Sequence, residues 1–286
     1  MICGNQIPYL SFTIYKNLPV KAAVSIRKGG VSPSPYDSLN MGLHTGDSLE
    51  NVLENRRRFF HELGLDAKQL INCRQVHGTH IEIVTKKDCG RGALSLESSI
   101  PGTDGLITDE PAVPLTMNYA DCTPLFFFDP VRKVIGLSHG GWRGTAGNIV
   151  GKTVDLMVEK FGCDPKDILG AIGPAIGFEN FEVGGEVVEA MRPLFTPAEF
   201  EKLYQTKPNG KYLFALAEAN HVLMKKAGLP ENHIEDCHFC TWDRDDLFYS
   251  YRKDHGDTGR HMAVLMMKSR KSPSLPALPQ AWAGNS

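Results

Sequence analysis

Residues 104–144 constrain the fold more than any other stretch of the chain. Their sequence, DGLITDEPAVPLTMNYADCTPLFFFDPVRKVIGLSHGGWRG, is a series of short apolar runs that proline, glycine and aspartate interrupt. Runs of this length with such boundaries predict β-strands. The predicted strands cover residues 113–120, 124–129 and 133–139. The last two are expected to form a hairpin that turns at Asp129 and Pro130.

A helix is predicted directly after these strands. In TAGNIVGKTVDLMVEKFG, residues 145–162, apolar side chains recur every three or four positions, and Gly162 marks the expected end. A second helix is predicted over residues 48–65, with Ser48 as its N-cap. The other predicted helices are residues 197–205 and 213–229, and the other predicted strands are residues 80–86, 167–177, 247–254 and 261–268.

The order of these elements predicts one domain. Strands and helices alternate without an internal repeat or a linker, which favours a single mixed α/β domain over residues 1–268. Residues 269–286 are rich in proline and serine and have no periodicity, so a disordered tail is predicted there.

Composition narrows the function classes. The 286 residues carry a formal net charge of -2, so no basic excess recommends nucleic acid as a partner. No apolar stretch approaches the roughly 20 residues of a membrane span, and the N-terminus does not resemble a signal peptide. The seven cysteines are therefore expected to be thiols, and the expected location is the cytoplasm. The isolated pair Cys237 and Cys240 favours buried or incidental thiols over a structural zinc site.

Residues 146–153, AGNIVGKT, match the loosest phosphate-loop pattern. A phosphate loop needs its glycines in a strand-to-helix turn, with the lysine at the start of the helix. Here Gly151, Lys152 and Thr153 fall inside the predicted helix, where backbone amides already bond to carbonyls. The sequence therefore argues against a nucleotide hydrolase.

The predicted strand-to-helix turn lies upstream, in SHGGWRG. Gly140, Gly141 and Gly144 would let backbone amides approach an anion there, and Arg143 would add a charged, bidentate donor. Arg143 could instead form a structural ion pair, and Trp142 is expected in the core. An oxyanion site is one interpretation of this turn.

Three potential metal ligands stand at the ends of predicted elements, where functional sites are usually built. His77 precedes a strand, Cys122 lies in a turn between two strands, and His139 ends an apolar strand. Two imidazoles and one thiolate are a suitable set for a catalytic zinc ion that keeps one position open. Spacing alone does not show that they meet, and His80 could replace His77.

Several stretches resemble, in chain order, the motifs of the YfiH-like family, also called the laccase-domain or polyphenol-oxidase family. They are QVHG, DGLITD, ADCTP, SHGGWRG, GPAIG and SYRKDHGDTGR, and SIRKGGVSPSPYDSLNMGLHTGD resembles two further motifs nearer the N-terminus. The resemblance runs from about residue 20 to about residue 267. Separate motifs in the right order make a chance match very improbable.

The resemblance implies a fold, a metal and a reaction. The implied fold is a single α/β domain of layered β-sheets covered by helices, similar to the cytotoxic necrotizing factor toxins. The implied metal is one zinc ion, held by His77, Cys122 and His139. The implied substrates are purine nucleosides: phosphorolysis of adenosine, inosine, guanosine and methylthioadenosine, and deamination of adenosine. The older laccase name implies copper and phenol oxidation, and some bacterial members are linked to cell-wall precursor quality control.

The chain departs from the family pattern in places. Gly140 stands where the family motif HAGWRG has alanine, and Ile26 stands where a threonine precedes the arginine. Cysteines common after GPCIG are absent, because Glu179 and Asn180 occupy that region. The chain also lacks the H-x-H pairs that a multicopper oxidase needs. Zinc is therefore the expected cofactor and copper the alternative.

The sequence leaves the remaining roles open. Asp121 and Glu182 are candidate proton donors, although each could instead hydrogen-bond a turn or cap a helix. Arg143 suits phosphate, while Arg252 and Arg260 are either further anion contacts or solvated charges. Two other classes remain: a thiol hydrolase, such as a cell-wall precursor editing enzyme, with Cys122 as nucleophile, and a binding protein with a structural zinc ion.

Overall fold

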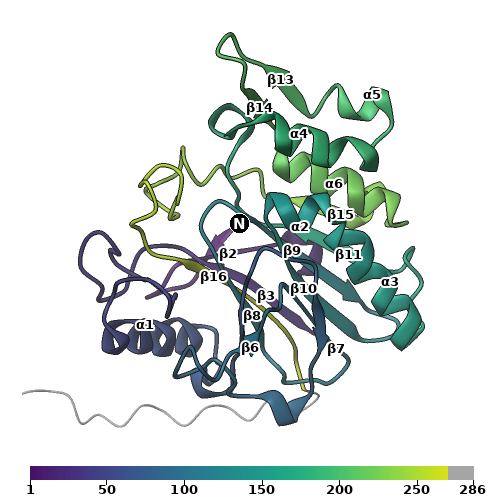
Figure 1. Cartoon of the computed structure of the whole chain (residues 1–286). Coiled ribbons are helices and arrows are strands. Elements are labelled where there is room, and N and C mark those ends of the chain that lie inside the picture. The colour runs from purple at the N-terminus through teal and green to yellow at the C-terminus, as the bar shows by residue number, and fades with distance from the viewer. Residues whose placement is uncertain (270–286) are drawn as a thin grey trace, which may run out of the picture.

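Two β-sheets lie face to face at the centre of the molecule, with helices on both outer faces (Figure 1). The structure, a computed structural model, describes residues 1–269. The first sheet runs, in spatial order, β1 (Ile2–Cys3), β2 (Tyr9–Ser11), β3 (Val20–Ser25), β16 (His261–Met267), β8 (Leu115–Tyr119), β4 (Ile71–Arg74) and β6 (Ile100–Pro101). The second runs β15 (Ile234–Asp236), β11 (Leu169–Ile172), β9 (Thr123–Asp129), β10 (Val134–Gly140), β7 (Gly105–Thr108) and β5 (Ile81–Ile83).

Helices cover the outer face of each sheet. They are α1 (Leu49–Glu62), α2 (Trp142–Ala146), α3 (Ile149–Phe161), α4 (Gly185–Met191), α5 (Pro197–Phe200) and α6 (Leu216–Lys226). Helix α1 packs on the first sheet, whereas α3 and α6 pack on the second. A small third sheet, β12 (Glu182–Val183), β14 (Tyr212–Phe214) and β13 (Tyr204–Thr206), lies beyond the second layer with α4 and α5 (Figure 1). The predicted fold of layered sheets covered by helices is confirmed.

Burial on both faces explains the continuous apolar runs of the sequence. In β9, Phe126 and Phe128 enter the core between the two sheets, while Leu125 and Phe127 enter the core under α3 and α6. In β16 the same alternation sends Leu265 inward and neighbouring side chains toward α1. A strand buried on both faces needs apolar residues at every position rather than at alternate ones.

The hairpin predicted from Asp129 and Pro130 is present. Strands β9 and β10 pair antiparallel, with Val134 opposite Asp129, and Asp129 Oδ1 accepts hydrogen bonds from the amides of Val131 and Arg132. The N-cap at Ser48 is also confirmed, since its side chain accepts a hydrogen bond from Asn51 N.

The helix predicted over residues 145–162 is two helices. Helix α2 begins at Trp142, and the chain breaks at Asn148, whose positive φ of 56° allows it to cap α3. Lys152 is therefore in the first turns of α3 rather than deep inside a helix, which corrects the prediction. The amides remain satisfied: Asn148 Oδ1 accepts from Gly151 N at 3.1 Å, and Asn148 O accepts from Lys152 N at 3.0 Å.

The strand predicted over residues 247–254 is wrong. This segment is a series of turns, because successive side chains are buried in different places instead of alternating across a sheet. Leu247 and Phe248 pack against Ile26, and the Tyr249 hydroxyl donates to Tyr36 O at 2.8 Å. The strands β2 and β3 near the N-terminus were not predicted, and the tail predicted to be disordered lies outside the described residues apart from Ser269.

No helix among residues 1–269 is long and apolar enough to cross a membrane.

Candidate functional site

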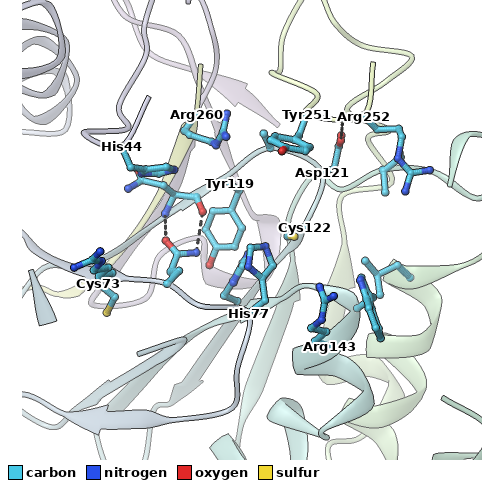
Figure 2. A pocket seen from close by; sticks show the side chains of 18 of the residues that line it. His44, Cys73, His77, Tyr119, Asp121, Cys122, Arg143, Tyr251, Arg252 and Arg260 are labelled. Carbon is cyan, nitrogen blue, oxygen red and sulfur yellow. Dashed lines mark hydrogen bonds between the residues drawn. The ribbon is translucent and has the colours of Figure 1, made fainter. Parts of the chain in front are cut away.

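The three predicted metal ligands meet where the chain passes between the two central sheets. His77 lies in the connection from β4 to β5, and Cys122 lies in the connection from β8 to β9, so both connections cross from the first sheet to the second. His139 lies near the end of β10, and its ring contacts that of His77 with centroids 4.9 Å apart. One donor atom from each residue lies within 4.8 Å of the other two. Figure 2 shows His77 and Cys122 side by side in this cluster.

Two residues of the site have left-handed backbone conformations that are costly for side chains other than glycine. His77 has φ 60° and Asp121 has φ 84°. Such conformations persist only where surrounding contacts determine them, and they concentrate at functional sites. At both positions a buried carboxylate bonds to backbone amides and supplies that determination.

Asp104 connects both histidines. Its Oδ1 accepts hydrogen bonds from the His139 ring at Nδ1, at 2.8 Å, and from the His77 amide at 3.0 Å. Its Oδ2 accepts from the amides of Val76 and Gly78, at 3.1 and 2.8 Å. With Nδ1 bonded to a carboxylate, His139 presents Nε2 toward Cys122, as metal-ligating histidines commonly do. Asp104 is the first residue of the DGLITD motif, but no local pattern in the sequence predicts its contact with His139.

The cluster also favours an ionised thiol. Burial alone would raise the pKa of Cys122, but the charge of His139 and hydrogen bonds from His139 and His77 outweigh it and lower that pKa. Burial would lower the pKa of His139, but the charge of Cys122 and the hydrogen bond to Asp104 raise it. The thiolate is the form that ligates metals and attacks electrophiles.

Gly141 leaves the space that the cluster occupies. A Cβ at this position would lie 3.0 Å from Cys122 Sγ and 3.0 Å from His77 Cδ2. The other two glycines predicted at the site pack against atoms that are not potential metal donors. A Cβ on Gly140 would meet Leu125 and Thr123 O, and a Cβ on Gly144 would meet the backbone oxygens of Gly78 and His139. Close packing therefore accounts for Gly140 and Gly144, and Gly141 alone borders the cluster.

The cluster lies in a cavity of about 530 Å³ whose wall is rich in arginine. Its lining includes Arg74, Arg143, Arg252 and Arg260, with Trp142, Tyr119, Phe181 and Tyr251 as aromatic walls. The guanidinium carbon of Arg143 lies 4.3 Å from the centre of the Trp142 ring, and no carboxylate lies within 4.0 Å of Arg143 among the described residues. Trp142 is partly buried against the core, as the sequence predicts, and its side chain also lines the cavity.

The two candidate proton donors lie differently from each other. Asp121 lines the cavity and is 8% exposed, but its Oδ1 accepts from Thr241 Oγ1 at 2.6 Å and its Oδ2 from Arg252 N at 2.7 Å. Burial raises the pKa of Asp121, although these hydrogen bonds oppose the rise. Glu182 is not in the cavity lining; hydrogen bonds from Lys207 and Lys211 lower its pKa to about 2, so it cannot donate a proton near neutral pH.

His80, Lys152 and the pair Cys237 and Cys240 all lie outside the cluster. His80 is exposed and bonds to Glu82 at 3.1 Å, so His77 and not His80 joins the cluster. The Lys152 ammonium donates to Thr79 Oγ1 at 2.9 Å and lies outside the cavity lining. Cys237 packs against the core between the sheets, and Cys240 Sγ accepts from Gly177 N at 3.2 Å.

Comparison with known proteins shows which family the chain is similar to. Residues 21–268 match the family described as multi-copper polyphenol oxidoreductase laccase. Purine nucleoside phosphorylase YlmD of Geobacillus stearothermophilus is 43% identical over 244 residues, which cover 85% of this chain and 89% of that protein. Purine nucleoside phosphorylase YlmD of Bacillus subtilis is 36% identical over 256 residues, covering 90% of this chain and 91% of that protein.

A solved structure shows the same fold. The crystal structure of YlmD from Geobacillus stearothermophilus superimposes with a TM-score of 0.88 at 39% identity, covering 93% of this chain and 97% of that one. The predicted resemblance is thereby confirmed along nearly the whole described chain. The protein belongs to the laccase-domain family that includes the YlmD and YfiH proteins.

Proposed function

We propose that the protein is a zinc-dependent purine nucleoside phosphorylase that acts on adenosine, inosine, guanosine and methylthioadenosine and that also deaminates adenosine. The observation that carries the proposal is the presence, in one cavity, of the cluster of His77, Cys122 and His139 and of Arg143 without a carboxylate partner. The relatives named purine nucleoside phosphorylases support the class of reaction.

The residues of the cluster fit zinc. Two imidazoles and one thiolate leave one coordination position for water or substrate, which is the pattern of catalytic zinc sites. Asp104 fixes the tautomer of His139, and Gly141 keeps side-chain atoms away from the three donors. A bound zinc ion would supply Lewis-acid polarisation of an oxygen atom in the cavity.

Arg143 would hold the phosphate. Its guanidinium is exposed to the cavity and stacks on Trp142, which restricts its orientation before an anion binds. In phosphorolysis a phosphate oxygen forms a bond to C1′ of the ribose while the bond from C1′ to the purine nitrogen breaks. The electron pair of that bond leaves with the base, which takes a proton originally carried by the phosphate. Holding phosphate beside the ribose removes much of the entropic cost of this step.

Asp121 would act as a positioning residue. Both of its oxygens accept hydrogen bonds, and the bond from Arg252 N ties the turn segment that carries Tyr251 and Arg252 to the Cys122 turn. Adenosine deamination would use the same cavity: an oxygen from water bonds to the purine carbon, the bond from that carbon to the amino nitrogen breaks, and the nitrogen takes a proton from that water.

A thiol hydrolase is the second candidate function, and one observation favours it. Asp104, His139 and Cys122 are arranged as an orienting acid, a base and a nucleophile, the order found in cysteine hydrolases. A copper oxidase is less well supported, since residues 1–269 contain a single cluster of three donors and the multicopper reaction needs several metal centres.

Metal analysis combined with alkylation tests these alternatives. Purified protein, prepared without added metal, is expected to carry about one zinc per chain. Iodoacetamide should then label Cys122 only after treatment with a chelator, while Cys3, at the exposed edge strand, serves as the internal control that reacts in both conditions. Redox-active copper at one or more per chain would contradict the zinc assignment. Rapid labelling of Cys122 in metal-replete protein would favour the thiol hydrolase.

A further inference from the structure

The cavity holds more positive charge than one phosphate ion requires. Four arginines line it, and the single carboxylate in the lining, that of Asp121, is already bonded to Thr241 and Arg252 N. Purine nucleosides themselves are neutral. An arginine-rich wall without acidic partners is typical of a site that binds an anionic ligand.

The cavity arginines differ from arginines elsewhere on the molecule. None of the four has a carboxylate within 4.0 Å in the described chain. Outside the cavity, the arginines that pair with a carboxylate are Arg27, Arg57, Arg58, Arg91, Arg192 and Arg244. Arg56 and Arg132, also outside the cavity, bond to backbone carbonyl oxygens instead. In the described chain, six of the eight arginines outside the cavity therefore pair with a carboxylate, and none of the four in the cavity does.

Arginines stand on two sides of the cluster, and on one side His44 accompanies them. Burial and the charge of Arg260 lower the pKa of His44 to about 4. Figure 2 shows Arg143 and Arg252 on one side of Cys122 and His77, and His44 and Arg260 on the other, with Tyr119 between. The two groups come from different parts of the chain: Arg143 follows β10, whereas Arg260 precedes β16 and His44 lies in the connection before α1. One phosphate bound at Arg143 would leave His44 and Arg260 without an anionic partner.

Arg260 is held firmly while part of its guanidinium stays free. Nη1 donates to Thr258 O and Gly259 O at 2.7 and 2.9 Å, and the guanidinium carbon lies 5.3 Å from the centre of the Tyr251 ring. A Cβ on Gly42 would lie 2.9 Å from Arg260 Cγ, so the His44 connection packs against the arginine stem. No hydrogen bond from Nε or Nη2 to another described residue is present.

The surroundings make the charge of Arg260 costly in an empty cavity. Burial lowers the pKa of Arg260, and the nearby groups that oppose this are Tyr251, Cys122, Asp121 and Tyr36 rather than a paired carboxylate. Asn40 holds the backbone at Arg260 and the backbone of the connection that carries His44. Its Oδ1 accepts hydrogen bonds from Arg260 N and Gly42 N, at 2.9 and 3.0 Å. An anion at Arg260 would offset the cost and meet a rigid, pre-positioned donor.

We infer that His44 and Arg260 form a second oxyanion subsite, which binds the 5′-phosphate of a nucleoside monophosphate. This inference rests on the proposed function, because it places the nucleoside across the cluster, between Arg143 on one side and His44 with Arg260 on the other. The free phosphate occupies the Arg143 side, and the phosphate carried by the substrate occupies the His44 side. Nucleotides would then bind more tightly than the corresponding nucleosides.

Binding of inosine and inosine 5′-monophosphate tests the inference without catalysis. Calorimetric titration of metal-quantified, full-length protein in phosphate-free buffer should give at least about tenfold tighter binding of the monophosphate, as two charge-assisted hydrogen bonds permit. Arg260→Gln should reduce this ratio to below about threefold while changing the affinity for inosine little. The matched control is Arg244→Gln, because Arg244 pairs with Asp246 outside the cavity and should leave the ratio unchanged.

The outcomes separate this inference from the proposed function. Phosphate-dependent cleavage of inosine, together with equal affinities for inosine and its monophosphate, would overturn the subsite and leave the proposed function standing. If that equality were accompanied by an Arg260→Gln increase in the KM for inorganic phosphate, the subsite would serve free phosphate and the nucleotide assignment would be wrong. Should Arg260→Gln not fold, His44→Gln provides the same test, and the wild-type ratio needs no variant.

Discussion

The Asp104 carboxylate accepts a hydrogen bond from His139 Nδ1 at 2.8 Å while it also binds the amides of the loop that carries His77. Asp104 is fully buried, and hydrogen bonds from His139 and from these amides keep its pKa below the usual range although burial opposes this. One side chain therefore sets the orientation of two residues of the cluster, His77 from the β4–β5 connection and His139 from strand β10.

Asp104→Asn should weaken zinc binding by about 10- to 100-fold, because the amide cannot accept at both atoms and one NH₂ group would face backbone donors. Competition with a zinc chelator measures this affinity. Asp129→Asn is the matched control, since Asp129 is equally buried and also accepts hydrogen bonds from backbone amides, those of Val131 and Arg132, but at the opposite end of β9 from Cys122. Unchanged zinc affinity in the Asp104 variant would contradict the positioning role.

Gly141→Ala should also impair metal binding, because its Cβ would lie 3.0 Å from both Cys122 Sγ and His77 Cδ2. Gly136→Ala, a substitution within β10, should leave zinc content near one per chain, since its Cβ would lie 3.3 Å or more from side-chain atoms of Thr153, Met157 and Ile107 and near no residue of the cluster. Zinc content by elemental analysis compares the two. Equal zinc content in both variants would show that the space at Gly141 is not required.

Arg143→Ala should lower kcat/KM for phosphorolysis by on the order of 100-fold, the usual cost of losing one donor to a developing or bound oxyanion. Lys152→Ala should change activity by less than about twofold and stability by less than about 0.5 kcal/mol, because its ammonium binds only Thr79 on the surface. Steady-state kinetics with folded variants decides the matter. The reverse pattern would place the phosphate at the AGNIVGKT stretch.

The buried His261 should make the protein less stable in mild acid. Burial and, to a smaller extent, the charge of Arg260 lower the pKa of His261 to about 3, and neither ring nitrogen has a hydrogen-bond partner. Between the unfolded value of 6.5 and about 3, the unfolded chain binds a proton that the folded chain does not, so the free energy of unfolding falls as pH decreases.

The measurement is urea unfolding of wild type and His261→Leu at pH 7 and pH 5. The loss of stability between these pH values should be about 2 kcal/mol larger in the wild type, and comparing the two proteins cancels groups that they share. An identical pH dependence would mean that His261 takes up a proton in the folded state.

The sequence predicted the residues of the cluster better than it predicted the residues that support them. His77, Cys122 and His139 stand next to strong apolar runs, so their places at element ends could be inferred from local pattern. Asp104 acts on His139 across 35 positions of the chain, and no local pattern reports such a contact. The same reason explains why the sequence does not predict the arginine-lined cavity as one surface, since its lining residues range from His44 to Arg260 along the chain.

The secondary structure was predicted correctly where local residues determine it and wrongly where long-range contacts do. The hairpin of β9 and β10 follows from its own apolar residues and turn. The segment around Phe248 has strand-like composition, but its backbone is held by distant groups, such as Asp121, which accepts from Arg252 N. Tertiary contacts decided its conformation against its local preference.

The most direct test of the central claim is product analysis of inosine and adenosine incubated with zinc-quantified protein, with and without phosphate. Free base and ribose 1-phosphate should form only when phosphate is present, inosine should form from adenosine in its absence, and Cys122→Ser should lose both reactions together. Folded protein that carries zinc and converts no purine nucleoside under either condition would contradict the account.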